Sequence, residues 1–102
     1  MTRAHIPIPQ DQIAAFCRKH HIRKLSLFGS VLRDDFRPDS DVDVLVEFEP
    51  GQTPGYFDLA GMEQELTDLL GRKADLRTEA ELSKYFRAEV VREAEPYYVA
   101  PV

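Results

Sequence analysis

The chain has 102 residues, of which 43% are hydrophobic and 30% charged, and its formal net charge is −5. This length suits one domain with a modest core, so we expect a single domain over residues 1–102. The acidic balance disfavours direct binding to nucleic acid, because a phosphate backbone attracts basic proteins. A protein partner with basic groups suits this chain better.

The sequence carries no sign of export or membrane insertion. Cys17 is the single cysteine, which excludes an intramolecular disulfide and fits a reduced compartment. The first residues contain no apolar stretch of the signal-peptide kind. No apolar run approaches the roughly 18 residues that a membrane-spanning helix needs. We therefore expect a cytoplasmic protein without membrane association.

The first predicted element is a helix from about Gln10 to His20. Ile13, Phe16 and Cys17 recur at the i, i+3, i+4 spacing of one helix face. A free cysteine on such a stripe usually packs in the core, and we place Cys17 there. His20 and the next histidine end the helix, where imidazole complements the helix dipole. Adjacent helical residues face different ways, so we do not expect this pair to bind a metal.

A strand is expected from Ile22 to Phe28, and Gly29-Ser30 follows it directly. Taken alone, these two residues predict a strand-to-helix turn with Ser30 as N-cap. They also suit a small turn in which backbone N–H groups face a phosphate. A short helix begins at this turn and ends before Pro38.

Asp41 and Asp43 begin the next apolar run, which continues from Val44 to Val46. Side chains alternate along a strand, so the two carboxylates point to the same face, roughly 7 Å apart at ~3.3 Å per residue. That separation is short enough for them to share metal ions. The acids therefore make us favour a phosphate cradle at Gly29-Ser30 over a plain turn.

Gly29-Ser30, ten intervening residues and then Asp41-x-Asp43 make a pattern that resembles the polymerase-beta-type nucleotidyltransferases. The short length and the stretch LFGSVLRDDFRPDSDVDVLVEFE resemble their minimal nucleotidyltransferase (MNT) branch, the antitoxin partners of HEPN-domain toxins. The resemblance extends to the tail LSKYFRAEVVREAEPYY. It implies an α/β (α+β) fold in which helices pack against a small mixed β-sheet, with the site at an open edge.

Beyond the second strand the chain breaks and then forms a longer helix. The stretch 47–55 contains two prolines and two glycines, so we expect a connection there rather than a lid. A helix over 56–70 follows, and Gly71 ends it. The apolar stripe of this helix is predicted to be core and not a cofactor site: Leu59, Met62, Leu66, Leu69 and Leu70.

A third strand is expected over 72–78. Alternation puts Ala74 and Leu76 on one face and three charged residues on the other: Lys73, Asp75 and Arg77. The resemblance adds Asp75 to the site, because in that family a third carboxylate comes from a neighbouring strand. Aspartate is also unfavourable in strands, which argues for a role. The alternative is a solvent-facing residue without one.

The last predicted helix spans roughly 79–95 and is broken near residue 83, with Pro96 stopping it. Its apolar positions are Leu82, Phe86 and Val90. The apolar tail that follows, Tyr97 to Val99, packs either on the core or on a partner.

The resemblance implies specific site residues. Asp41, Asp43 and Asp75 would be catalytic and bind metal, and the nucleotide would be bound by Gly29, Ser30 and Arg33. Hard carboxylate oxygens suit two Mg²⁺ ions, or Mn²⁺ in their place, and the ions would remove the repulsion among the acids. The first two aspartates would hold the metal of the ATP triphosphate. Asp43 and Asp75 would place the second metal at the nucleophile, and Asp75 would accept the hydroxyl proton.

We accordingly expect a nucleotidyltransferase-type antitoxin that moves AMP from ATP to a hydroxyl, on a tyrosine, of a HEPN toxin with which it forms a hetero-oligomer. Two alternatives stay open. A small-molecule nucleotidyltransferase generally carries an acceptor-binding domain, for which 102 residues leave no room. A non-enzymatic antitoxin that only covers its partner has no need of clustered acids.

Other metal and phosphate motifs do not fit. Asp39, Asp41 and Asp43 match three ligand positions of an EF-hand loop. However, Val44 stands where that loop requires glycine, and Pro50 stands where it requires glutamate. The sequence contains neither a P-loop nor a dinucleotide-binding fingerprint.

Overall fold

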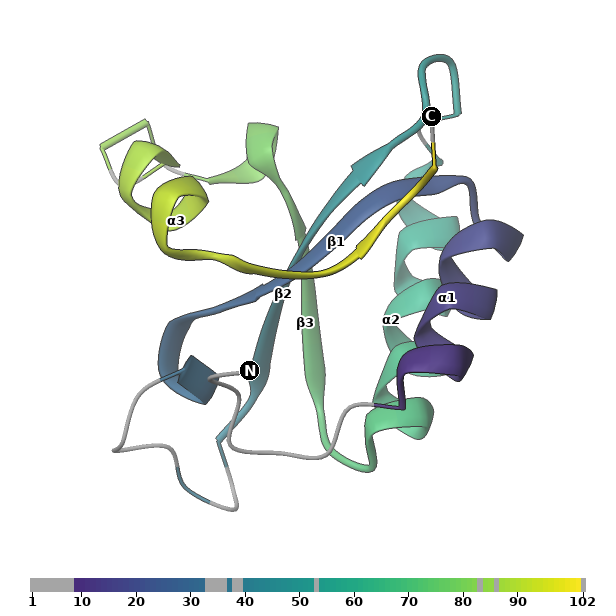
Figure 1. Cartoon of the computed structure of the whole chain (residues 1–102), viewed down its shortest axis with the longest axis horizontal. Helices are drawn as coiled ribbons and strands as arrows, with labels where there is room; N and C mark the ends of the chain where they lie inside the picture. The colour runs from purple at the N-terminus through teal and green to yellow at the C-terminus, as the bar shows by residue number, and fades with distance from the viewer. Residues whose placement is uncertain are drawn as a thin grey trace.

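The computed structural model describes residues 9–32, 37, 40–52, 54–82, 84–85 and 87–101. Figure 1 shows a central sheet with helices α1 and α2 side by side against one face and helix α3 on the other side. The elements, in chain order, are α1 (Gln10–Lys19), β1 (Ile22–Phe28), the 3₁₀ turn η1 (Gly29–Leu32), β2 (Val42–Phe48), α2 (Tyr56–Leu70), β3 (Ala74–Thr78), the 3₁₀ turn η2 (Glu79–Glu81), α3 (Arg87–Glu93) and β4 (Glu95–Val99).

The sheet has four strands in the order β3-β2-β1-β4. Strand β1 is antiparallel to β2 and to β4, whereas β2 and β3 are parallel. Helix α2 makes the crossover that a parallel pair requires. The expected small mixed sheet with helices packed against it is therefore confirmed. None of the described helices is long and apolar enough to span a membrane.

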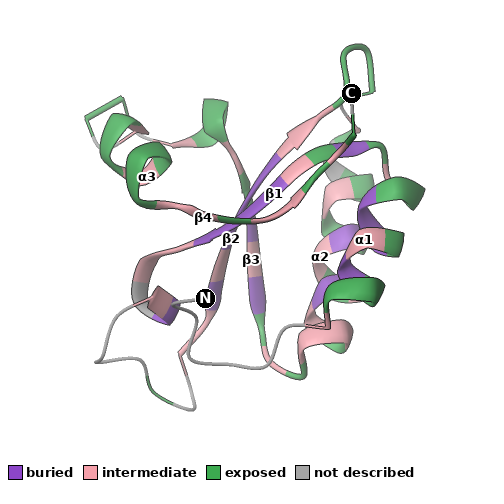
Figure 2. Ribbon diagram, viewed as in Figure 1, coloured by how far each residue is buried: buried purple, intermediate pink, exposed green. Residues whose placement is uncertain are grey.

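The core lies between the sheet and the helices α1 and α2. In Figure 2 the buried residues follow the middle of the strands and the helix faces turned towards them. The predicted stripe of α1 is buried, and in α2 Met62 and Leu66 are buried while the other stripe residues are partly buried. The buried core comprises Ile13, Phe16, Cys17, Ile22, Leu25, Leu27, Val31, Val42, Val44, Val46, Met62, Leu66, Ala74 and Leu76.

Strand β3 is an edge strand, and side chains of α2 bind its outer backbone groups. The N–H of Ala74 donates to Thr67 Oγ1 at 3.0 Å, and the N–H of Leu76 donates to Glu63 Oε2 at 2.8 Å. Unpaired edge groups invite pairing with other chains, and these bonds satisfy two of them. They also fix the backbone on both sides of Asp75.

The C-terminal region differs from the predicted helix over 79–95. The chain instead forms η2, the short helix α3 and the strand β4. Thr78 and Glu81 form a capping box, with the Thr78 N–H donating to Glu81 Oε1 at 3.1 Å. Pro96 favours an extended residue before it, so the strand already includes Glu95. Part of the predicted apolar stripe, Phe86, lies outside the described residues.

Strand β4 was predicted only as an apolar tail. It pairs with β1, for instance Tyr98 opposite Leu25. Tyr97 and Tyr98 are partly buried and pack against the core, as the first alternative for the tail expects, whereas Val99 is 62% exposed. Strand β2 likewise continues to Phe48, beyond the predicted start of the connection, because Phe48 pairs with Ile22. The third strand begins at Ala74 instead of residue 72.

Candidate functional site

The strand register brings three predicted site residues, Gly29, Asp43 and Asp75, to one end of the sheet. Strand β1 ends where β2 and β3 begin, because it runs antiparallel to β2, which is parallel to β3. Phe28 pairs with Asp43, and Asp43 pairs with Asp75. Directly opposed residues point to the same face, and neighbouring strands lie about 4.8 Å apart. Asp43 therefore lies between the end of β1 and Asp75.

Gly29 is the turn residue that brings the chain against Asp43. Its φ is +78°, a left-handed conformation that side chains rarely tolerate. A Cβ atom built at this position would lie 3.2 Å from Cγ of Asp43 and would overlap its carboxylate oxygen. Val31, two residues on, is fully buried and anchors the turn to the core. The predicted turn is confirmed, and glycine is required there for two separate reasons.

Asp41 comes directly before β2, at the outer end of the same row of acids. The N–H of Val42 donates to the carbonyl oxygen of Lys73 at 2.9 Å, which ties the starts of β2 and β3 together. Lys73 Nζ lies 4.0 Å from Asp41 Oδ2. The sequence placed Lys73 on the face of Asp75, but its pairing with Asp41 follows only from the strand register.

The three aspartates are close along the backbone, but their side chains do not form a metal site as they stand. Among the described side chains, no three His, Cys, Asp or Glu residues gather closely enough to hold a metal ion. The backbone nevertheless places Asp43 opposite Asp75 on adjacent strands, and Asp41 directly precedes β2. Carboxylates are the ligands that Mg²⁺ takes, and an aspartate turns by rotation about its side-chain bonds alone. The donor atoms are of the kind that binds a divalent ion, and the aspartate side chains would have to turn to share one.

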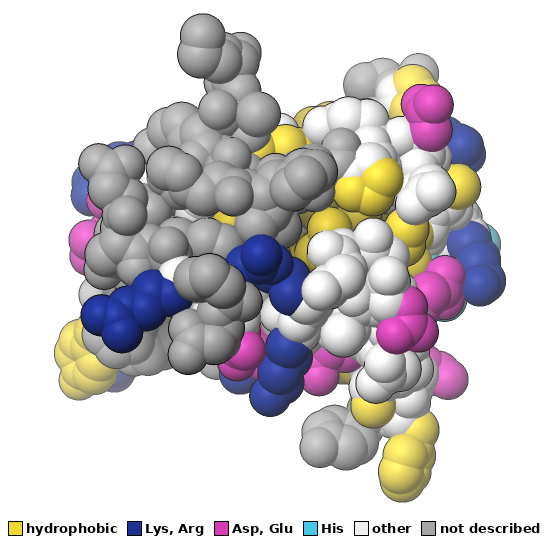
Figure 3. Space-filling model, turned by 90° about the horizontal axis from the view of Figure 1, so that it is seen from below, with side chains coloured by type: hydrophobic (Ala, Val, Ile, Leu, Met, Phe, Trp, Pro, Cys, Tyr) yellow, Lys and Arg dark blue, Asp and Glu magenta, His cyan; other side chains and the backbone are white. Residues whose placement is uncertain are grey.

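Two predicted nucleotide-binding groups are not placed. Ser30 belongs to η1 through its backbone, but its side chain is outside the described part of the structure, as is the whole of Arg33. Their contacts with a phosphate stay predictions. Figure 3 views the molecule from this end of the sheet, and basic and acidic side chains lie next to one another near the centre of the view.

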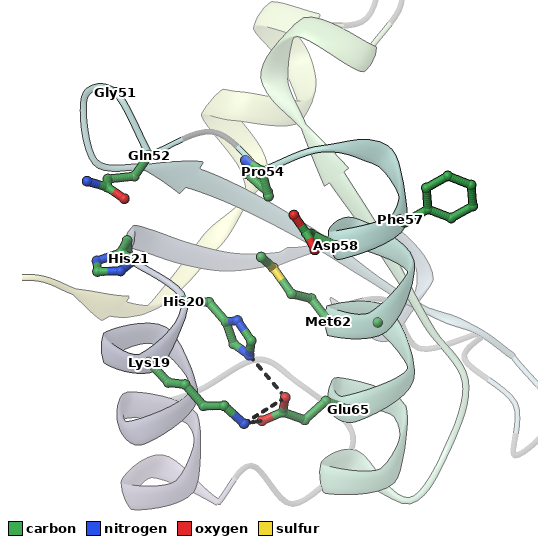
Figure 4. Close-up of a pocket in the computed structure, with 11 residues that line it drawn as sticks. Lys19, His20, His21, Gly51, Gln52, Pro54, Phe57, Asp58, Met62 and Glu65 are labelled. Carbon is green, nitrogen blue, oxygen red and sulfur yellow. Dashed lines mark hydrogen bonds and ion pairs between the residues drawn. The ribbon is translucent and has the colours of Figure 1, made fainter.

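A separate pocket of about 620 Å³ lies at the opposite end of the sheet. It opens between the end of α1, the turn after β2 and the start of α2. Figure 4 shows the side chains of Lys19 and His20 converging on Glu65, with Phe57 turned away from the cavity. His20 Nε2 lies 3.0 Å from Glu65 Oε1, and Lys19 Nζ lies 3.2 Å from the same oxygen.

This cluster joins α1 to α2. The hydrogen bond from His20 lowers the pKa of the Glu65 carboxyl and Lys19 acts in the same direction, whereas partial burial opposes them. Sequence analysis assigned His20 only to the helix end and missed Glu65, because the two lie 45 positions apart and neither carries a local signal of the contact. None of the predicted catalytic or nucleotide-binding residues lines this pocket, so we assign its polar groups to helix packing.

The sequence pattern of the nucleotidyltransferase domain family matches residues 10–98. The chain belongs to this family. The protein adenylyltransferase MntA of Thermococcus cleftensis is 36% identical to this nucleotidyltransferase over 72 residues, which is 71% of each chain. A candidate protein adenylyltransferase of Methanocaldococcus jannaschii is 33% identical over 76 residues, covering 74% of this chain and 80% of that one. The chain is thus an enzyme of the nucleotidyl-transfer class.

Solved structures place this nucleotidyltransferase in the minimal (MNT) branch. A candidate minimal nucleotidyltransferase is 35% identical, with a TM-score of 0.68 over 91% of this chain and 88% of that one. A toxin–antitoxin complex with AMP-PNP gives a TM-score of 0.74 at 20% identity, covering 91% and 75%. An MNT antitoxin complex with the tri-AMPylated HEPN toxin of Shewanella oneidensis gives 0.66 at 20%, covering 89% and 70%. The last two likenesses establish the polymerase-beta-like fold alone.

Proposed function

We propose that this nucleotidyltransferase is an antitoxin that transfers AMP from ATP to a tyrosine hydroxyl of a HEPN toxin. The observation that carries the proposal is the position of Asp43, held between the Gly29 turn and Asp75 by the strand register. It puts acids that suit metal ions beside a turn that suits phosphate. The names of the relatives, which are protein adenylyltransferases, favour a protein as acceptor.

The roles proposed for the residues follow their positions. The backbone of Gly29 and Ser30, with Arg33, binds the phosphates of ATP. Asp41 and Asp43 hold the cation that accompanies the triphosphate, and Asp43 and Asp75 hold a second one near the acceptor. Two Mg²⁺ ions, if bound by these residues, would supply charge neutralisation and alignment of the two reacting oxygens.

The transfer itself is a displacement at the α-phosphorus of ATP. The tyrosine oxygen forms a bond to this phosphorus, and the bond to the bridging oxygen breaks. Pyrophosphate leaves with the electron pair, and Asp75 takes the proton of the attacking hydroxyl. Asp75 is half-buried on the edge strand β3, a position that an incoming side chain of a partner can reach.

The acceptor is presented by another chain in this proposal. The protein works as a single domain over residues 1–102, in the cytoplasm, as one member of a hetero-oligomer with its toxin. A docked partner holds the hydroxyl at a high effective concentration, which replaces an acceptor-binding domain. The net charge of −5 disfavours a nucleic acid in that position.

The test is intact mass spectrometry of the cognate HEPN toxin after incubation with this protein, ATP and Mg²⁺. We expect stepwise gains of one AMP unit, mapped to tyrosine by peptide sequencing. The double variant Asp41→Ala/Asp43→Ala should give no gain. As a control of equal charge change, Asp11→Ala/Asp68→Ala removes two exposed acids of α1 and α2 and should leave the gain intact.

Two outcomes contradict the proposal. If the toxin gains no mass and Asp41→Ala/Asp43→Ala still neutralises it in cells as well as wild type, inhibition occurs by covering the partner. If the toxin gains no mass while ATP is converted to AMP-labelled small molecules, the acceptor is a small molecule.

A further inference from the structure

Lys73 is a basic residue within the row of acids, and the proposed reaction does not use it. It directly precedes β3, and its carbonyl oxygen accepts the 2.9 Å hydrogen bond from the N–H of Val42. This bond continues the register in which Val42 pairs with Ala74, so Lys73 stands opposite Asp41. Its ammonium lies 4.0 Å from Asp41 Oδ2.

The Lys73 side chain contributes little to holding the fold. It is 67% exposed and its partner Asp41 is 42% exposed. Exposed ion pairs contribute about 0–1 kcal/mol, and a separation of 4.0 Å is at the long end of such pairs. The backbone of Lys73 is anchored through its carbonyl oxygen, independently of the side chain. The ammonium is therefore available for another partner.

A positive side chain beside these acids would complement the charge of a bound nucleotide. A nucleotide triphosphate brings several negative charges to a row that already holds Asp41, Asp43 and Asp75. Lysine suits this task because it is a compact charge with several donors on a flexible stem, and it commonly binds phosphate. Lys73 already lies beside one of these acids, with its ammonium 4.0 Å from Asp41 Oδ2.

We propose that Lys73 exchanges partners when the nucleotide binds. In the empty site its ammonium neutralises Asp41. When Asp41 turns to the cation that accompanies the triphosphate, the ammonium moves onto the phosphate chain and remains there as pyrophosphate forms. No bond to Lys73 is made or broken. This inference rests on the proposed function and adds a nucleotide-binding residue to it.

The exchange predicts that Lys73→Met weakens the binding of the nucleotide but not the binding of the metal alone. In Lys73→Met, Mg²⁺·ATP binds about tenfold more weakly, as for the loss of one charge-assisted hydrogen bond. Mn²⁺ alone binds as tightly as to wild type or more tightly, because the competing cation on Asp41 is gone. Lys73→Arg keeps the charge and most of the affinity for Mg²⁺·ATP. A merely structural lysine would weaken both ligands on removal.

Lys19 offers a matched control. It is 65% exposed and pairs with Glu65 at 3.2 Å, at the opposite end of the sheet. Lys19→Met removes the same charge from a similarly exposed lysine in an ion pair, at a place far from the proposed site. We expect Lys19→Met to bind Mg²⁺·ATP like wild type. Titration calorimetry without toxin measures the nucleotide, and electron paramagnetic resonance measures free Mn²⁺.

The outcomes separate this inference from the proposed function. If wild type binds Mg²⁺·ATP and Lys73→Met binds it equally well, the exchange is wrong and the proposed function stands. The exchange is also wrong if Lys19→Met loses as much affinity, or if Lys73→Met binds Mn²⁺ more weakly. If wild type does not bind Mg²⁺·ATP at all, the proposed function fails and this inference fails with it.

Discussion

Gly29 and Asp43 meet where β1 ends and β2 begins, so closely that a side chain on Gly29 would overlap the carboxylate of Asp43. The two residues belong to the two halves of the sequence motif. The antiparallel pairing of Phe28 with Asp43 sets their distance. The glycine and the aspartate are thus one packed unit, which explains why the turn must carry glycine and not merely a small residue.

We predict that Gly29→Ala destabilises the protein by about 2 kcal/mol or more. A left-handed alanine costs about 1 kcal/mol or more, and overpacking adds roughly 1–3 kcal/mol. Gly51→Ala is the control, because Gly51 has the same φ of +78° with nothing within 4 Å of the added Cβ. It should show the conformational cost alone. Urea denaturation measures both free energies of unfolding.

The contact with Asp43 can be isolated by a double-mutant cycle. Asp43→Ala removes the carboxylate that the new methyl group would overlap. Gly29→Ala should therefore cost less in the Asp43→Ala background than in wild type. Equal costs for the two glycine variants, together with additive effects in the cycle, would show that the contact does not constrain position 29.

Asp75→Asn should raise the stability of the metal-free protein. Asp43 and Asp75 are directly opposed on parallel strands, and like charges in that position are unfavourable by roughly 0.2–1 kcal/mol. Thermal unfolding in EDTA measures the change. Asp41→Asn should give no change or a smaller gain, because it also removes the weak pair with Lys73. A clear fall in stability for either variant would mean that the acid supports the fold.

Much of the fold could be predicted because its signals are local. The apolar residues of α1 and α2 recur at helical spacing, and Gly71 ends α2 with φ +74°. The C-terminal region was predicted only in part, because α3 lies within the predicted helix but β4 was not predicted. Residues 79–95 are rich in helix-favouring types, so propensity alone extends the predicted helix to residue 95. The strand β4 forms because β1 has an edge with which it can pair, and this information lies far away in the chain.

The candidate site, like the fold, has some residues with a local sequence signal and others that depend on pairing between distant strands. The spacing of Asp41 and Asp43 along one strand is local, and it predicted their common face. The alignment of Asp75 with Asp43 depends on the parallel pairing of β2 and β3, so the sequence supplied it only through family resemblance. The pairing of Lys73 with Asp41 also depends on the parallel pairing of β2 and β3. The residues next to Lys73 and Asp41 in the sequence give no sign of it.

Cys17 should be unreactive in the folded protein. It is fully buried, and burial raises the pKa of its thiol to about 12. The thiolate is the reactive species, so a disulfide reagent at pH 8 should label native protein only as fast as it unfolds. Because the chain has one cysteine, complete labelling in urea gives the end point. Rapid labelling of native protein would show that α1 opens locally.

The contact of His20 with Glu65 should make stability depend on pH in acid. The hydrogen bond from His20 is the largest cause that lowers the pKa of Glu65 in the folded protein, and Lys19 contributes less. A carboxyl with a lowered pKa stabilises the fold above its unfolded-state pKa of about 4.3. This stabilisation is lost as the pH falls through the lower, folded-state value. The side chain of Glu65 is 36% exposed, so we expect only about 0.5–1 kcal/mol.

The comparison of wild type with Glu65→Gln by urea denaturation, from pH 7 down to acid, tests this. The free energy of unfolding of wild type should exceed that of Glu65→Gln near pH 7, and the difference should shrink below about pH 4, where the unfolded-state glutamate takes up its proton. His20→Leu should remove most of this pH-dependent difference, because it removes the larger cause, whereas Lys19→Met should leave most of it. A difference between wild type and Glu65→Gln that persists unchanged through the acid range would rule out the ionised Glu65 as its source. A larger loss of the difference with Lys19→Met than with His20→Leu would reverse the order of the two causes.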